Sequence, residues 1–381
     1  MVMQIPRVLT NAVVEKLTNT QKGVIIYGAR QVGKTTLATT VIEKMGLRAL
    51  TINGDQNRFI DIISSRDLMR IQSLVSGYEL LFIDEAQRIP EIGINLKIIL
   101  DNIPTLKVLV TGSSSLDLAS KISEPLTGRV WNYQLFPVSF FELRALHNRV
   151  ELDETLPERL VFGSYPELIT MINERDKKEY LQNLSDAYLY RELIEFGEIK
   201  NSSKIRDLLK LLAFQIGSEV SLTEVGRQLG MGKDTVDRYV GLLEKSFVIF
   251  RLKGFSRNLR KEITKMDKIF FYDLGIRNVL IDNLKDLPNR DDLGKLWENF
   301  LLVERMKFMK YSGRLYSPYF WRTYTGAELD YIEERAGTLS GFEFKFQAKG
   351  NRIPATFSAT YPDSRFEEIS RANYLDFILQ D

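Results

Sequence analysis

One short motif near the start of the chain restricts its fold more than any other feature. Residues 28–35 read Gly-Ala-Arg-Gln-Val-Gly-Lys-Thr, which fits the pattern G-x-x-x-x-G-K-[ST]. The apolar run 23–28 leads into the motif, and a helical pattern over residues 36–45 follows it. In this context, glycines let backbone N–H groups converge on phosphate oxygens at the N-terminus of a helix. The sequence therefore predicts a phosphate-binding loop in an α/β fold.

The motif also assigns roles to individual side chains. Lys34 is expected to reach the β and γ phosphates of a nucleotide, and the Thr35 hydroxyl is expected to bind Mg²⁺. A plain glycine-rich turn is the alternative, but the strand before the loop and the helix after it argue against that interpretation. The predicted phosphate-binding residues of this loop are Gly28, Ala29, Arg30, Gln31, Val32, Gly33, Lys34, Thr35 and Thr36.

Two further strand ends carry polar side chains suited to the same site. The apolar run 79–84 ends in Asp84 and Glu85. Asp84 is expected to hold Mg²⁺, and Glu85 is expected to polarise the attacking water, although such an acidic pair can also cap the next helix. Ser113 follows the run 106–111, and its hydroxyl is expected either to contact the γ-phosphate or to cap the following helix.

Composition excludes several kinds of chemistry. The 52 Lys and Arg residues nearly balance the 50 Asp and Glu residues, so a net charge of +2 gives no global field for nucleic acid or membrane. The chain has no cysteine and only His147, which excludes cysteine nucleophiles, thiolate metal sites and a histidine-rich metal site. No apolar run is long enough to span a bilayer, and the first residues do not resemble a signal peptide. We therefore expect a cytoplasmic protein with no membrane partner.

The order of these features resembles the AAA-type P-loop ATPases. Apolar runs at 23–28, 48–53, 79–84, 106–111 and 130–135 have the pattern of parallel strands separated by helices. The acidic pair and the segment Leu-Thr-Gly-Arg that ends at Arg129 add to the likeness. The resemblance implies ATP and Mg²⁺ as cofactors, and it implies that Arg129 stabilises the γ-phosphate in its own chain or in a neighbouring subunit of an oligomer. A salt bridge from Arg129 to a helix end is the alternative.

Later segments point to a subfamily of these ATPases. Residues 137–143 and 163–168 resemble bacterial and archaeal members with a long C-terminal half of unsettled function. Residues 221–245 read as two helices joined by a glycine-containing turn, and 247–254 as strands, which together resemble a winged helix-turn-helix.

The winged-helix candidate leaves DNA contact and protein packing both open. DNA binding would place Lys233, Thr235 and Arg238 in the major groove. From residue 251 to residue 268 there are seven Lys and Arg against two acids, which suits phosphate contacts. Asp234 and Asp237 on the same helix would instead repel a phosphate. The seven basic residues are Arg251, Lys253, Arg257, Arg260, Lys261, Lys265 and Lys268.

A set of charged residues near the end of the chain resembles the PD-(D/E)xK nuclease core. Residues 326–334 and 342–346 read as paired strands with a turn at 337–341, and their alternation puts Glu343, Lys345 and Asp330 on one side. The resemblance implies Mg²⁺ bound by Asp330 and Glu343, with Lys345 beside the reacting phosphate. The additional acid of that family falls on the preceding helix, and an ordinary amphipathic hairpin is the alternative. The candidates for the helix acid are Glu298 and Glu304.

Together these features predict an α/β fold of four parts. A P-loop parallel sheet at 1–136 with a helical lid at 137–202 is followed by a winged helix at 203–268 and a small α+β nuclease-like domain at 269–381. The predicted function is a Mg²⁺-dependent ATPase that acts as a nucleotide-driven switch on DNA or on a protein partner. Two alternatives are an ATP-regulated, metal-dependent nuclease and a nucleotide-gated scaffold that does not hydrolyse ATP.

Overall fold

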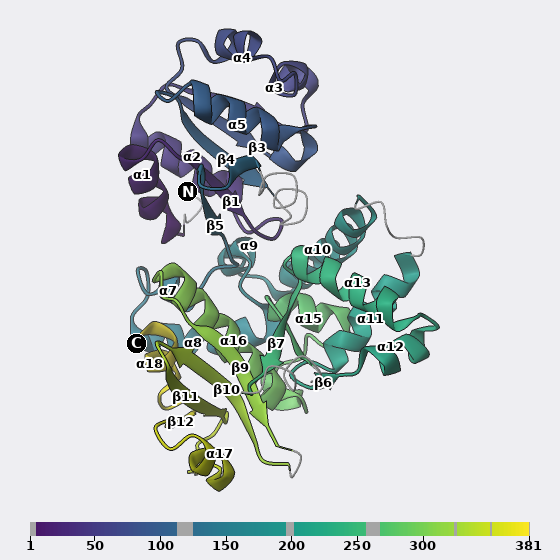
Figure 1. The fold of residues 1–381 in the computed structure, drawn as a ribbon. Helices are drawn as coiled ribbons and strands as arrows, with labels where there is room; N and C mark the ends of the chain where they lie inside the picture. Colours follow the sequence, from purple (N-terminus) through teal and green to yellow (C-terminus); the bar gives the residue numbers. More distant parts are fainter. Residues whose placement is uncertain are drawn as a thin grey trace. The chain divides into compact units, whose positions relative to one another are not determined.

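The contacts within the chain divide it into two compact units, each with its own β-sheet (Figure 1). The first unit comprises residues 4–137 with 245–247, and the second comprises residues 138–244 with 248–381. The computed structural model describes residues 5–112, 125–195, 202–256, 267–323, 326–350 and 353–380.

The first unit contains the five-stranded parallel sheet that the apolar runs predict. Its strand order is β2-β3-β4-β1-β5, and every neighbouring pair is parallel. The strands at the centre are almost wholly buried, as expected for a sheet with both faces covered. The α/β prediction is therefore confirmed for this unit. The strands are β1 (Gly23–Tyr27), β2 (Ala49–Asn53), β3 (Leu80–Asp84), β4 (Lys107–Gly112) and β5 (Val130–Gln134).

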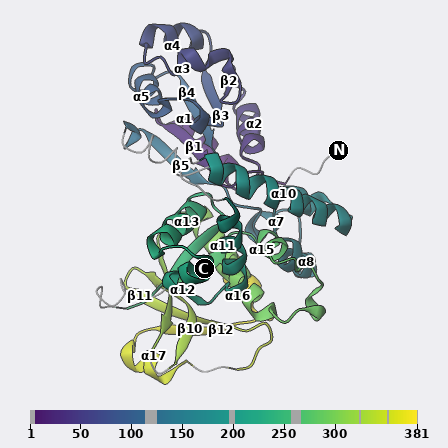
Figure 2. The ribbon, with the colours of Figure 1, turned by 90° about the vertical axis from the view of Figure 1, so that its right-hand side faces the viewer.

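Helices cover both faces of this sheet. Figure 2 shows α5 on one side of the strands and α2 on the other. An apolar core on the α5 side joins Ile71 and Leu96 from the helices to Ile25 and Ile83 from the strands. The helices are α1 (Leu9–Asn19), α2 (Lys34–Met45), α3 (Ile60–Ile63), α4 (Leu68–Val75) and α5 (Ile92–Asn102).

The second unit contains a mixed sheet of seven strands in the order β12-β11-β10-β9-β7-β8-β6. Strand β7, from the winged-helix candidate, pairs in parallel with β9, so strands from the third and fourth predicted parts share one sheet. The boundaries of the four parts stay predictions. The strands are β6 (Glu219–Val220), β7 (Ile249–Gly254), β8 (Asp267–Phe271), β9 (Ser317–Arg322), β10 (Glu328–Arg335), β11 (Thr338–Phe344) and β12 (Arg365–Ile369).

Helices accompany the seven-stranded sheet in the second unit. Among the described residues, none of the helices combines the length and apolarity needed to cross a bilayer. The helices are α7 (Phe140–Leu143), α8 (Arg149–Phe162), α9 (Pro166–Thr170), α10 (Glu174–Glu195), α11 (Ser202–Phe214), α12 (Leu222–Leu229), α13 (Lys233–Lys245), α15 (Leu274–Leu280), α16 (Leu293–Tyr311), α17 (Ala355–Thr360) and α18 (Tyr374–Leu379).

The hairpin turn near the end of the chain differs from the prediction. The sequence predicts a turn at 337–341, but Arg335 already pairs with Thr338, so that only Ala336 and Gly337 make the turn. Both residues have positive φ, at 47° and 81°, as the type I′ turn of a two-residue hairpin requires. A glycine is the usual marker of such a turn, and here the residue before it adopts the same conformation.

Candidate functional site

The predicted phosphate-binding loop lies between β1 and α2, at the carboxyl edge of the parallel sheet. Helix α2 begins at Lys34 with Gly33 as its N-cap, and no side chain caps its first N–H groups. The Lys34 side chain folds back over the loop, and its Nζ donates to the carbonyls of Gly28 and Ala29 at 2.9 and 2.7 Å. Lys34 is only 6% exposed. A largely buried cation and N–H groups of a helix N-terminus therefore face the same loop, which suits a phosphate.

Two positions of the loop depend on glycine. A Cβ on Gly28 would lie 2.2 Å from the Leu135 carbonyl oxygen, because the loop passes directly against the end of β5. Gly33 has a φ of 92°, in the left-handed region that glycine adopts without steric cost. The loop conformation therefore follows from the two glycines that the motif fixes.

Asp84 connects the loop to two strands of the sheet. This carboxylate lies at the end of β3 and is 7% exposed. Its Oδ2 accepts a hydrogen bond from the Thr35 hydroxyl at 2.9 Å, and its Oδ1 accepts one from Thr111 at the end of β4. A hydroxyl and a carboxylate in contact beside a phosphate-binding loop are the oxygen ligands that Mg²⁺ prefers. The site therefore fits a nucleotide with its metal ion.

Glu85 has an unusual backbone for a residue with a side chain. Its φ of 51° lies in the left-handed region, and its Oε2 accepts from Gln87 Nε2 at 2.5 Å. A Cβ on Gly54, at the end of β2, would lie 2.4 Å from the Glu85 carbonyl, so glycine is required at that position too. Non-glycine residues in this region cost of order 1–3 kcal/mol and cluster at functional sites. The conformation turns the chain sharply after Asp84.

Arg129 lies away from this edge of the sheet. It comes just before β5, and its carbonyl accepts from the N–H of Gly23, the first residue of β1, which places it at the amino edge. Its guanidinium pairs with Asp101 at the end of α5, with distances of 2.7 and 3.1 Å. This is the helix-end salt bridge that the sequence offered as the alternative. The geometry does not bring Arg129 to the loop of its own chain, and a role in a neighbouring subunit stays a prediction.

Arg7 contacts the loop, although the sequence gives no sign of it. Its Nη1 donates to the Val32 carbonyl at 2.7 Å, and its Nη2 donates to the Phe136 carbonyl at 2.6 Å. Val32 belongs to the loop, while Phe136 immediately precedes Pro137, where the first unit ends. Arg7 therefore links the loop to the segment that leads out of this unit. Ser113, the remaining predicted nucleotide contact, lies outside the described residues.

The basic residues at 251–268 of the winged-helix candidate offer less positive charge for phosphate contacts than their number suggests. Arg251 pairs with three carboxylates, those of Asp237, Glu244 and Asp267, at 2.8, 3.0 and 3.7 Å. Lys268 is buried in an ion pair. The expected surplus of free positive charge is thus reduced, because acids of the same region neutralise part of it. Four of the seven basic residues lie outside the described part of the chain, namely Arg257, Arg260, Lys261 and Lys265.

The predicted nuclease-like residues lie near one another in the second unit, and Lys268, which is not among them, joins the group by pairing with Glu298. Lys345 Nζ pairs with Glu343 at 2.5 Å, and Asp330 Oδ2 accepts from the Phe344 N–H at 2.8 Å. Burial raises the pKa of Glu298 to about 7. The charge of Lys268 acts to lower this pKa and the charge of Asp330 acts to raise it. Both residues therefore interact electrostatically with Glu298, which belongs to the same cluster. Glu304, the other predicted helix acid, instead pairs with Lys307. Across the described residues, no three acids or histidines are arranged to hold a metal ion.

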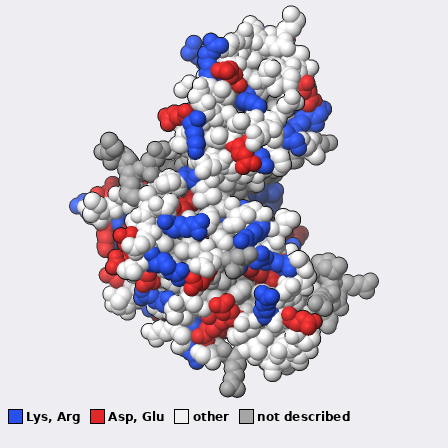
Figure 3. All heavy atoms as spheres, turned by 90° about the vertical axis from the view of Figure 1, so that its left-hand side faces the viewer, with Lys and Arg blue, Asp and Glu red and all other residues white. Residues whose placement is uncertain are grey.

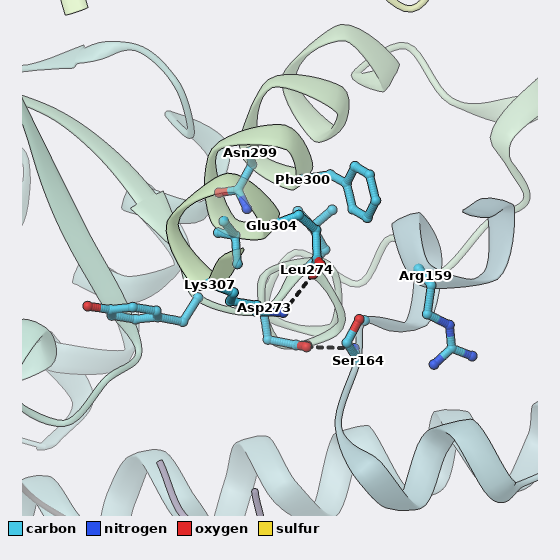
Figure 4. A pocket seen from close by; sticks show the side chains of 11 residues that line it. Arg159, Ser164, Asp273, Leu274, Asn299, Phe300, Glu304 and Lys307 are labelled. Carbon is cyan, nitrogen blue, oxygen red and sulfur yellow. Dashed lines mark hydrogen bonds and ion pairs between the residues drawn. The ribbon is translucent and has the colours of Figure 1, made fainter. Parts of the chain in front are cut away.

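A second polar group surrounds a small pocket between α8, α15 and α16 (Figure 4). Asp273 Oδ2 accepts from the Ser164 N–H at 2.7 Å, and Lys307 pairs with Glu304 at 2.7 Å. Nε and Nη1 of the buried Arg159 have no hydrogen-bond partner within the described residues. The cavity of about 20 Å³ has room for about one water molecule. This group therefore fits polar packing and is too small for a nucleotide.

Comparison with known proteins covers most of the chain. Residues 20–144 match the model of the AAA domain, and residues 153–287 and 293–371 match two domains of unknown function, DUF8612 and DUF4143. The uncharacterized protein Rv2008c of Mycobacterium tuberculosis is 31% identical over 326 residues, which span 84% of this chain and 70% of that protein. The uncharacterized protein MJ1544 of Methanocaldococcus jannaschii is 26% identical over 299 residues, 74% of this chain and 65% of that protein.

Solved structures with some likeness include a Walker-type ATPase and DnaA. The Walker-type ATPase PABY2304 of Pyrococcus abyssi aligns with a TM-score of 0.47 and 16% identity, over 71% of this chain and 94% of that one. AMPPCP-bound DnaA of Aquifex aeolicus aligns with a TM-score of 0.33 and 15% identity, over 64% of this chain and 89% of that one. The match to the AAA domain covers the loop between β1 and α2, where the structure has the conformation suited to a phosphate that is described above. The chain therefore belongs to the same family as Rv2008c of M. tuberculosis, and it carries a P-loop ATPase domain of AAA type.

Proposed function

We propose that the chain binds ATP with Mg²⁺ at the loop between β1 and α2, hydrolyses it, and uses the nucleotide state as a switch. The contact between the Thr35 hydroxyl and Asp84 beside the buried Lys34 ammonium is the observation that carries this proposal. Lys34 would bind phosphate oxygens, and Thr35 and Asp84 would hold the metal ion. Mg²⁺, when bound with the nucleotide, neutralises charge that develops on the phosphates.

Glu85 would be the base in this proposal. It directly follows Asp84, and a catalytic base must lie within hydrogen-bond reach of the water that it orients. The bond from Gln87 holds one of its carboxylate oxygens in the structure described. Hydrogen bonds of catalytic groups commonly rearrange when substrate binds, so this bond is compatible with the role.

Arg7 supplies the connection that a switch requires. Its guanidinium joins the loop carbonyl of Val32 to the Phe136 carbonyl, one residue before Pro137. A change in the loop on hydrolysis would then alter the bond to the segment that leads into the second unit. Arg7 reaches the two carbonyls through separate nitrogens of its planar guanidinium, whereas a lysine at this position would have to bring both carbonyls within reach of its single Nζ.

Hydrogen exchange tests the switch and the role of Arg7 together. In a hydrolysis-impaired Glu85→Gln protein, we expect ATP and ADP to give different exchange in peptides that cover residues 133–142. Arg7→Ala and Arg7→Lys should abolish that difference while ATP still protects the loop peptide at 28–36. The matched control is Arg70→Ala, an exposed arginine on α4. If the Glu85→Gln protein showed the same exchange at residues 133–142 with ATP and with ADP, although the loop peptide was protected, the switch would be rejected and nucleotide binding retained.

We infer that α11, β6, α12, α13, β7 and β8 form a winged helix that packs within the chain rather than reading DNA. The pairing of β7 with β9 and the three acids around Arg251 support packing. Figure 3 draws the side of the second unit away from α12 and α13, on which blue and red side chains lie intermixed, so the support for packing comes from the contacts above.

A binding assay separates packing from DNA recognition. We expect the anisotropy of a labelled DNA duplex at physiological salt to change equally little with the parent protein and with a Lys233→Ala/Arg238→Ala variant. A DNA reader would instead lose affinity in that variant, by about 1–3 kcal/mol for each base contact. Such a loss, with unchanged ATP binding, would assign DNA as the partner.

A further inference from the structure

The nuclease-like cluster of the second unit contains a lysine that the family pattern does not include. Lys268, on β8, extends its ammonium toward α16, where Nζ lies 3.2 Å from Glu298 Oε1. Helix α16 packs against both β8 and β11, so it brings Lys268 to the acids of the hairpin strands. The cluster consists of Lys268, Glu298, Asp330, Glu343 and Lys345.

Burial and charge show that Lys268 belongs to this cluster. Its side chain is 8% exposed, and that of Glu298 is 13% exposed. The ammonium is therefore largely buried against the Glu298 carboxylate, which reaches it from a different element, and the charge of Asp330 also acts on this lysine.

The acids of the cluster already have partners within the protein. Glu298 pairs with Lys268, Glu343 pairs with Lys345, and Asp330 accepts from the Phe344 N–H. The two lysines pair with two of the cluster's three carboxylates, and Glu328, a further acid that acts on the cluster, pairs with Arg322 at 3.8 Å. A metal-binding cluster of like charges would instead depend on the metal for its neutralisation. A divalent ion would have to displace an ammonium and break a largely buried ion pair, which leaves a buried charge unpaired and is therefore unfavourable.

We propose that the Lys268 ammonium takes the place of the divalent cation in this nuclease-like site and closes it to metal. The residues thus do not fit the metal that the PD-(D/E)xK resemblance implies. The second unit would then serve as a binding or structural module, with its carboxylates held together by an internal cation. This inference stands independently of ATP hydrolysis in the first unit.

Mn²⁺ binding tests the proposal in the full chain. All proteins carry Lys34→Ala, which disables the nucleotide site, and free Mn²⁺ is measured by electron paramagnetic resonance without nucleotide. The Lys34→Ala protein is the parent in this experiment, and we expect Asp330→Asn to leave its Mn²⁺ binding unchanged. Lys268→Met should add a Mn²⁺ site that Asp330→Asn then removes, whereas Lys253→Met, an exposed lysine on the neighbouring strand β7, should add none.

Two results would overturn the proposal. The first is a Mn²⁺ site in the parent that disappears with Asp330→Asn, since Lys268 would then not exclude the metal. The second is a folded Lys268→Met protein that gains no Mn²⁺ site. If Lys268→Met does not fold, the comparison of the parent with its Asp330→Asn variant can still overturn the proposal, because it needs no change at Lys268.

Discussion

Replacing Glu85 by glutamine is expected to lower ATP hydrolysis by roughly 10² or more and to leave ATP binding intact. Glutamine keeps the size and most of the hydrogen bonding of glutamate, but it cannot accept a proton from the attacking water. The backbone of Glu85 is left-handed, and glutamine can adopt it at the same cost, so the loop after β3 should keep its shape. The loss should therefore appear in turnover and not in affinity.

Phosphate release and equilibrium binding of ATP, measured on the same preparation, check this expectation. Glu43→Gln is the matched control, because Glu43 is exposed on α2 and outside the loop. Turnover of Glu85→Gln at the level of the parent protein would move the base to another residue. Loss of ATP binding would mean that Glu85 supports the site instead of the chemistry.

Replacing Lys34 by alanine is expected to weaken ATP binding by at least tenfold, or about 1.4 kcal/mol. The variant loses the cation that faces the phosphates, and it also loses the hydrogen bonds from Nζ to the carbonyls of Gly28 and Ala29. The second loss would loosen the loop and weaken nucleotide binding further.

Calorimetry with ATP and Mg²⁺ measures this effect. Lys44→Ala is the control, since Lys44 lies in the last turn of the same helix and donates only outside the loop, to Asn11 at 2.6 Å. Lys34→Ala with the affinity of the parent protein would contradict the assignment of the loop as the phosphate site.

The conformation of the predicted phosphate-binding loop could be predicted from the sequence because its determinants are local. The loop, its two glycines and the first turn of α2 lie within consecutive residues, and their conformation follows from the motif itself. Asp84 could also be predicted, since the carboxyl ends of neighbouring parallel strands meet at one edge of a sheet. The same argument, applied to the end of β4, would have found Thr111.

The residues that sequence does not reveal act over long separations. Arg7 bonds to main-chain carbonyls 25 and 129 positions away, and any residue type supplies such carbonyls. Lys268 joins the nuclease-like acids from another strand of the sheet, and no spacing in the sequence marks its pairing with Glu298 or its electrostatic effect on Asp330. The sequence left two interpretations of Arg129 open because its partner, Asp101, depends on how α5 and β5 meet in the fold.

Steady-state release of phosphate from ATP tests the central claim most directly. The parent protein and Lys34→Ala are purified in parallel and assayed with Mg²⁺ and with EDTA in its place. The account predicts saturable release by the parent protein that requires Mg²⁺ and is lost in Lys34→Ala. Equal release by the two proteins, or none by the parent while it binds ATP, would contradict hydrolysis at the loop between β1 and α2.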